Sequence, residues 1–75
     1  MARTETLTAI SEREGVGFVA LCPELDIASQ GGCVEEAQAN LREAVELFFE
    51  TADASEIERR LVCEVYVTRL NVARE

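Results

Sequence analysis

Carboxylates and thiols are the side chains of this chain that could do chemistry, because its 75 residues include fifteen Asp and Glu, three Cys and no His. Convergent carboxylates can hold Mg²⁺ in a nuclease-type site, and Glu5, Glu24 and Asp26 lie on or beside expected strands. Glu24 and Asp26 flank a turn, however, where acidic side chains are usually solvated. We therefore expect no metal site, no cofactor and no enzyme activity.

The candidate nucleophiles lack activating partners. Without a histidine, the serines cannot form a hydrolase triad. Cys22, Cys33 and Cys63 are an odd number at wide spacings, which fits neither a zinc site nor a disulfide framework. Cys22 also has no basic neighbour in sequence to lower its pKa. We expect all three to be buried, reduced thiols that pack as small hydrophobes.

Length and charge narrow the function classes. The chain is long enough for one small domain, expected over residues 1–70 with a flexible tail over 71–75. Its net charge of −8, with every basic residue an Arg, disfavours direct nucleic-acid binding and suits a basic partner. Solubility alone would also explain the acidity. There is no apolar run long enough for a membrane span and no signal-type apolar core, so a cytoplasmic location is expected.

Three strands are expected before the first helix. Residues 4–12 are rich in threonine, and residues 18–22 are mostly apolar, which predicts an outer and a central strand. Pro23 ends the second strand because it has no N–H for a ladder. Residues 27–30 form a short third strand that Gly31 and the next glycine interrupt. Tight turns between these segments predict antiparallel pairing.

The helix that follows is amphipathic. Cys33 occupies the N-cap position with Glu36 three residues later, which is capping-box spacing with a poor cap, since a thiol accepts hydrogen bonds weakly. At 100° per residue, one apolar stripe contains Val34, Ala37, Leu41, Ala44, Val45, Phe48 and Ala52. Carboxylates occupy the opposite side.

A last strand completes the expected fold. Ser55 could cap one further turn over residues 56–60, and residues 61–70 then alternate apolar and polar side chains as a half-buried strand does. The fold class is therefore α+β in the order β-β-β-α-β. The last strand would run parallel to the first and give the sheet order 3-2-1-4. The sheet face without a helix would favour self-association as a dimer or tetramer.

The outward side of the helix is the candidate partner-binding surface. Leu47 lies among carboxylates there, so it could be the apolar centre of a contact patch. The alternative is an ordinary solvated helix face. The candidate residues are Glu36, Glu43, Glu46, Leu47 and Glu50.

Short motifs over residues 10–50 resemble the HicB-like antitoxin family. They are Gly17-Phe18-Val19-Ala20, Cys22-Pro23-Glu24-Leu25, Ser29-Gln30-Gly31, Glu35-Glu36-Ala37, Asn40-Leu41 and Glu43-Ala44. The segment Glu64-Val65-Tyr66-Val67-Thr68 is similar to the final strand of some members. The chain departs from the pattern at Cys33, where the family usually has Thr.

The resemblance implies a HicB-like fold, described as partial ribonuclease-H-like, and a partner. HicB-type proteins bind HicA, a small basic mRNA-cleaving toxin, and block its active surface. Many carry a C-terminal DNA-binding segment, and since this chain ends at Glu75 we expect no such segment and no autorepression by it alone. The alternative is a stand-alone oligomeric domain with a structural or ligand-binding role and no toxin. A short, basic, His-containing neighbouring gene would favour the antitoxin.

Overall fold

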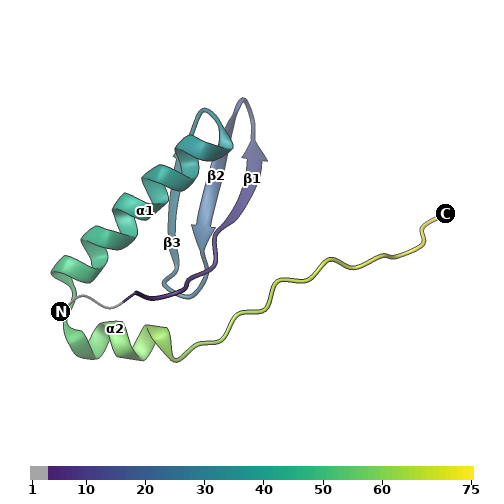
Figure 1. Cartoon of the computed structure of the whole chain (residues 1–75). Coiled ribbons are helices and arrows are strands. Elements are labelled where there is room, and N and C mark those ends of the chain that lie inside the picture. The colour runs from purple at the N-terminus through teal and green to yellow at the C-terminus, as the bar shows by residue number, and fades with distance from the viewer. Residues whose placement is uncertain (1–3) are drawn as a thin grey trace.

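The computed structural model describes residues 4–75, in which a three-stranded antiparallel sheet is followed by two helices (Figure 1). The strands are β1 (Ile10–Glu14), β2 (Gly17–Cys22) and β3 (Ile27–Gly31), in the spatial order β1-β2-β3. The helices are α1 (Val34–Thr51) and α2 (Ala54–Leu61). The predicted α+β class, the antiparallel pairing and the position of β2 in the centre are confirmed.

β1 and β2 form a hairpin with a two-residue loop. Glu14 pairs with Gly17, and Gly15 has a φ of 61° at the first loop position, which glycine adopts without steric cost. The predicted start of the first strand at residue 4 is wrong, since β1 begins at Ile10, opposite Leu21. β2 ends just before Pro23, so residues 4–9 have no part of β2 to pair with. The side chain of Glu24 holds this segment instead.

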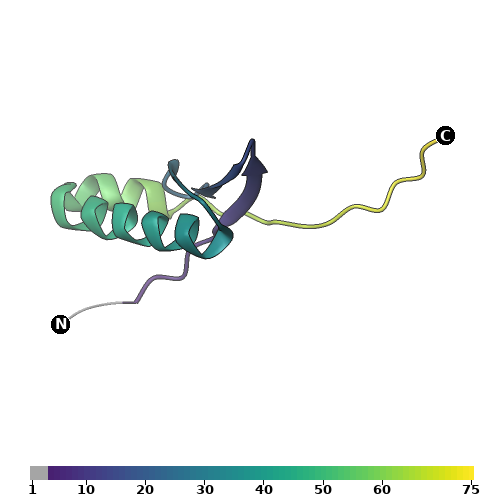
Figure 2. The same ribbon diagram turned by 90° about the horizontal axis from the view of Figure 1, so that it is seen from above.

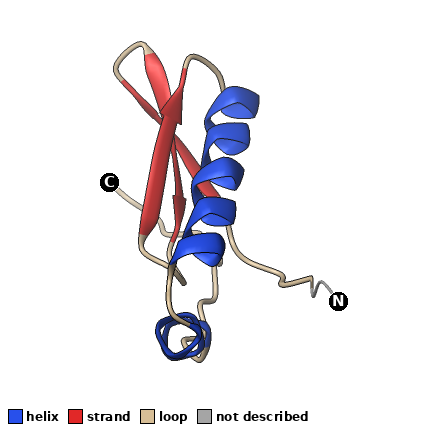
Figure 3. Cartoon of the chain, turned by 90° about the vertical axis from the view of Figure 1, so that its left-hand side faces the viewer, coloured by secondary structure: helices blue, strands red, loops and turns tan. Residues whose placement is uncertain are grey.

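The core lies between the sheet and α1, which covers one face as Figure 3 shows. Side chains of β2 alternate, so Ala20 and Cys22 are buried beneath the helix. Ala37 and Leu41 are buried from the helix side, as the predicted stripe requires. Leu25, in the turn after β2, completes the core and is fully buried.

The end of β3 touches the first turn of α1. A Cβ placed on Gly31 would lie 2.6 Å from the backbone nitrogen of Ala37, which is inside any normal contact distance. Gly31 therefore permits the close approach of strand and helix. Asn40 fixes the same contact, because its Nδ2 donates to the Gln30 carbonyl oxygen at 2.8 Å.

α2 is longer than the predicted single turn. Its N-cap residue is Asp53 and not Ser55, and the helix continues through Leu61. Arg60 anchors it, because the guanidinium donates to the carbonyl oxygen of Leu25 and lies 5.0 Å from the ring centroid of Phe48. A polar contact and a cation–π contact thus hold α2 at the end of the sheet.

The predicted fourth strand is not formed. Residues 62–75 follow α2 and are here called the arm, which turns at Val62, is extended after it and leaves the sheet and helices in Figures 1 and 2. Alternating apolar residues show only that a segment is suited to a sheet. A strand also needs a neighbour that forms backbone hydrogen bonds with it, and within the described residues 4–75 no strand pairs with the arm. β1 accordingly remains an edge of the sheet.

The face of the sheet opposite α1 is uncovered in the described part of the chain, as expected (Figure 3). Ile10, Val19 and Leu21 lie on this face and are half-buried.

Candidate functional site

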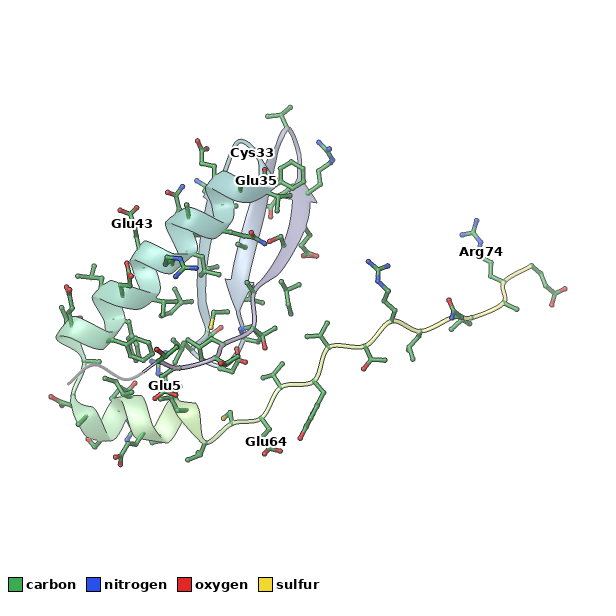
Figure 4. The ribbon with its side chains drawn as sticks, viewed as in Figure 1. Glu5, Cys33, Glu35, Glu43, Glu64 and Arg74 are labelled. Carbon is green, nitrogen blue, oxygen red and sulfur yellow. The ribbon has the colours of Figure 1, made fainter. Side chains whose placement is uncertain are left out.

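The five predicted partner-binding residues lie on the side of α1 that points away from the sheet. All five are exposed, and we call this surface the outer face of α1: Glu36, Glu43, Glu46, Leu47 and Glu50. Figure 4 shows Glu43 projecting away from the body of the protein. From Glu36 to Glu50 the surface extends about 21 Å along the helix axis.

Leu47 is the apolar member of this surface. It is 58% exposed, and on a helix its neighbours at i−4 and i+3 are Glu43 and Glu50. Within the described residues, no ion pair engages Glu43, Glu46 or Glu50. The surface therefore offers an accessible leucine and three carboxylates without a cationic partner.

Glu36 differs from the other four because its carboxylate has a structural contact. Cys33 is the N-cap residue with no side-chain cap bond, as predicted. Glu36 Oε1 accepts a hydrogen bond at 2.6 Å from the backbone N–H of Gly32, one residue before the cap. This bond supports the chain as it enters α1, much as in a capping box. Substitution of Glu36 would thus change the helix start as well as the surface.

A groove of about 870 Å³ lies on the other flank of α1, between that helix, α2 and the segment before β1. Its apolar part includes Leu7, Val45 and Phe49. Arg42 contributes a polar group, as does Glu46, which lies where the outer face of α1 borders the groove. Sequence reasoning missed this groove because it depends on where α2 docks. The signal available in the sequence was the i, i+4 spacing of Ile57 and Leu61, which was not interpreted as the apolar side of a docked helix.

The wall of the groove includes Cys22, whose chemistry is suppressed. Cys22 is 1% exposed. Burial of the thiol raises its pKa above the ordinary value of 9.0, and the adjacent Glu24 carboxylate raises it further. The thiol donates to Glu24 Oε1 at 3.5 Å. Cys22 is therefore a neutral, buried group, as predicted, and a poor nucleophile.

The prediction of burial is wrong for the other two cysteines. Cys33 and Cys63 are exposed, and all three thiols are free. Cys33 stands at the helix N-cap, where its side chain faces solvent, and Cys63 belongs to the arm, which packs on no sheet here.

Glu24 tethers the segment before β1. Both oxygens of its carboxylate accept from the Thr8 backbone N–H, at 3.1 and 3.0 Å, and one also accepts from the Thr8 hydroxyl at 2.6 Å. Desolvation by burial raises the pKa of Glu24, but these hydrogen bonds outweigh it and hold the pKa below the ordinary value of 4.5. Glu24 is thus an ionised structural acceptor.

The carboxylates considered for metal binding do not form a site. Within residues 4–75, no group of three or more His, Cys, Asp and Glu side chains is placed to hold a metal ion. Glu24 is committed to Thr8, and Asp26 lies in the turn after β2 with a φ of 56°. The same part of the chain has no helix long and apolar enough to cross a membrane.

Comparisons of the chain with protein families, curated proteins and solved structures find no match.

Proposed function

We propose that this chain is a HicB-type antitoxin that binds a small, basic, HicA-like toxin through the outer face of α1. The observation that carries the proposal is the exposed Leu47 among carboxylates without cationic partners. The motifs over residues 10–50 support it, and their expected order of three strands and a helix agrees with β1, β2, β3 and α1.

Charge would act first in such an encounter. A net charge of −8 attracts a basic protein over several ångströms, and the potential is screened beyond about 10 Å at 0.1 M salt. Steering of this kind raises the association rate more than it slows dissociation. The carboxylates of Glu43, Glu46 and Glu50 would then pair with Arg or Lys at the rim of the contact.

Leu47 would supply the short-range contribution. A leucine that is 58% exposed in the free protein can lose most of that exposure in a pocket on the partner. Burial of one such side chain is worth about 1.5–3 kcal/mol. The surrounding carboxylates would exclude water from this anchor.

Neutralisation would be stoichiometric. No covalent bond would form, and the antitoxin would occupy the basic surface that the toxin needs for RNA. The fold proposed for the complete domain is partial ribonuclease-H-like, in which a fourth strand adds at the free edge of β1.

The experiment is co-expression with a HicA-like toxin encoded beside the gene for this chain. In the double variant Glu43→Lys and Glu46→Lys, the stopped-flow association rate should fall about tenfold at low salt, and growth rescue should weaken. Leu47→Asp should reduce the amount of toxin recovered in a pull-down more strongly. Circular dichroism verifies that each variant is folded.

The matched control is Glu14→Lys with Glu58→Lys. Both residues are exposed, and neither belongs to the outer face of α1. This control changes the net charge by the same amount, so it isolates local contact from overall steering. Equal effects of the two double variants, together with unchanged binding by Leu47→Asp, would refute the outer face of α1 as the toxin site.

The second candidate is a stand-alone oligomeric domain with a structural or ligand-binding role. The groove of about 870 Å³ beside α1 favours it, because such a volume falls in the range of small-molecule sites. This candidate would be favoured if no gene for a basic toxin lies beside the gene for this chain. It would also be favoured if the wild-type chain fails to rescue growth in the presence of a HicA-like toxin.

A further inference from the structure

The arm makes this protein less compact than its length requires. A 75-residue domain has a radius of gyration of about 11 Å. The observed value is 14.5 Å, and the longest dimension is 52 Å. Figures 1 and 2 show the arm accounting for this extension, with Glu64 and Arg74 far apart along it in Figure 4.

The side chains of the arm are those of a buried strand. Residues 65–68 are Val-Tyr-Val-Thr, all of them types that favour strands. Large apolar side chains exposed by 62–82% follow one another along the arm: Val62, Tyr66, Val67, Leu70 and Val72. Several large apolar side chains exposed along one short segment mark an interaction site.

An acceptor for such a strand exists on the sheet. β1 pairs with β2 on one side and with no strand on its other side within residues 4–75. Half of the N–H and C=O groups of an edge strand point outward and can pair with another chain. α1 packs chiefly over β3 and β2, so it does not obstruct this edge.

We propose that residues 65–70 of the arm add as a strand to the free edge of β1 in a second copy of this chain, and that the second copy returns its own arm in the same way. This inference does not depend on the proposed toxin binding. It names the surface that would make the protein a dimer.

The observations favour a second copy over the chain's own β1. Arg60 and Leu61 hold the start of the arm at the end of the sheet, where residues 63–66 lie near residues 5–7. Farther along, the arm diverges from its own β1 in Figures 1 and 2. An exchange of identical segments is symmetric, so each dimer gains the contact twice. The β1 edges and the apolar arms of both copies are covered by one arrangement.

Charge permits this contact. Residues 62–75 contain two Arg and two Glu, so the arm is neutral, and the remaining residues carry the whole net charge of −8. Contact through the neutral arm keeps most of the acidic surface of each copy away from the other. Contact between two acidic helix faces would meet strong like-charge repulsion.

The core of a single copy is small, so association would add to its stability. Within residues 4–75 it has five buried residues, of which Leu25 and Leu41 are the large aliphatic ones. Domains of this size bury a smaller fraction of their surface than larger domains do and commonly gain stability by association.

The first test is sedimentation equilibrium of the full chain, which should give about twice the monomer mass of 8.3 kDa at micromolar concentration. Val67→Asp should weaken dimerisation at least about 100-fold, since each of two arms loses a buried valine and places a charge in the contact. Val16→Asp is the matched control, because Val16 is 99% exposed in the hairpin loop. It should leave the dimer unchanged.

The second test places the arm in the wild type. A dimer formed from isotope-labelled and unlabelled copies should show NOEs between copies from the methyl groups of Val65 and Val67 to β1. A monomer, a dimer insensitive to Val67→Asp, or NOEs from the arm to β1 of the same copy would each overturn the proposal. If the exchanged dimer forms but the protein does not bind the toxin, the proposed function is refuted and the arm exchange is not.

Discussion

Truncation of Leu41 tests the packing of α1 on the sheet. Leu41 is 4% exposed among small neighbours such as Ala20, Cys22 and Ala37, which cannot move far enough to fill the space it would leave. Leu41→Ala should therefore cost about 2–5 kcal/mol, from lost burial and the residual cavity. A domain of 75 residues has roughly 4–11 kcal/mol in total. The variant should thus lose a large part of its stability.

The matched control lies on the same helix. Leu47→Ala makes the same chemical change at a side chain that is 58% exposed, so its cost should be below about 0.5 kcal/mol. Both variants would be measured by urea unfolding followed by circular dichroism, at one protein concentration because dimerisation adds to stability. Leu41→Ala should lower the midpoint by roughly 1.5 M or more, with an unchanged slope.

A third variant keeps the test decisive. If Leu41→Ala does not fold at all, Leu41→Met retains the volume and should cost less than about 1.5 kcal/mol, so that its transition can be measured. Equal midpoints for Leu41→Ala and Leu47→Ala would refute the assignment of the buried stripe. The outer face of α1 would then also have been placed wrongly.

The remaining predictions concern pH, close packing and thiol access. Because the pKa of Glu24 is lowered in the folded protein, its contribution is present above the ordinary value of 4.5 and is lost as pH falls below it. Thr8→Val should flatten the pH dependence of the urea midpoint in that range, and an unchanged slope with pH would contradict the tether. Gly31→Ala should cost about 1–3 kcal/mol in urea unfolding, since its Cβ would meet helix backbone; wild-type stability would show that β3 and α1 separate freely. Iodoacetamide should label the exposed Cys33 rapidly and Cys22 only on unfolding, as mass spectrometry would resolve, and early labelling of Cys22 would show that the core opens.

Local signals in the sequence predicted the central part of the fold. The apolar run after Gly17, the proline that ends β2 and the apolar stripe of α1 each depend on neighbours a few residues away. The exposure of the outer face of α1 could also be predicted from nearby residues. A residue opposite a buried apolar stripe is exposed, whatever that stripe packs on.

The features that sequence reasoning missed share a different origin. Leu25 lies in a turn, and its burial follows from the docking of α2 and the contact from Arg60, thirty-five residues away in sequence. The groove beside α1 and the tether from Thr8 to Glu24 likewise join segments that no local pattern relates. Such features depend on tertiary contacts, which single-sequence periodicity does not encode.

The arm shows where local pattern and topology separate. Its alternation predicts a strand equally well beside its own β1 or beside β1 of another copy, since both edges present the same backbone groups. The choice depends on the direction in which the chain leaves α2, and that direction is set by the anchoring of Arg60 and Leu61. The predicted order 3-2-1-4 assumed that the chain's own last strand adds beside β1, and the sheet of residues 4–75 has no such strand. Only a measurement that distinguishes contacts within one copy from contacts between copies can separate these two arrangements.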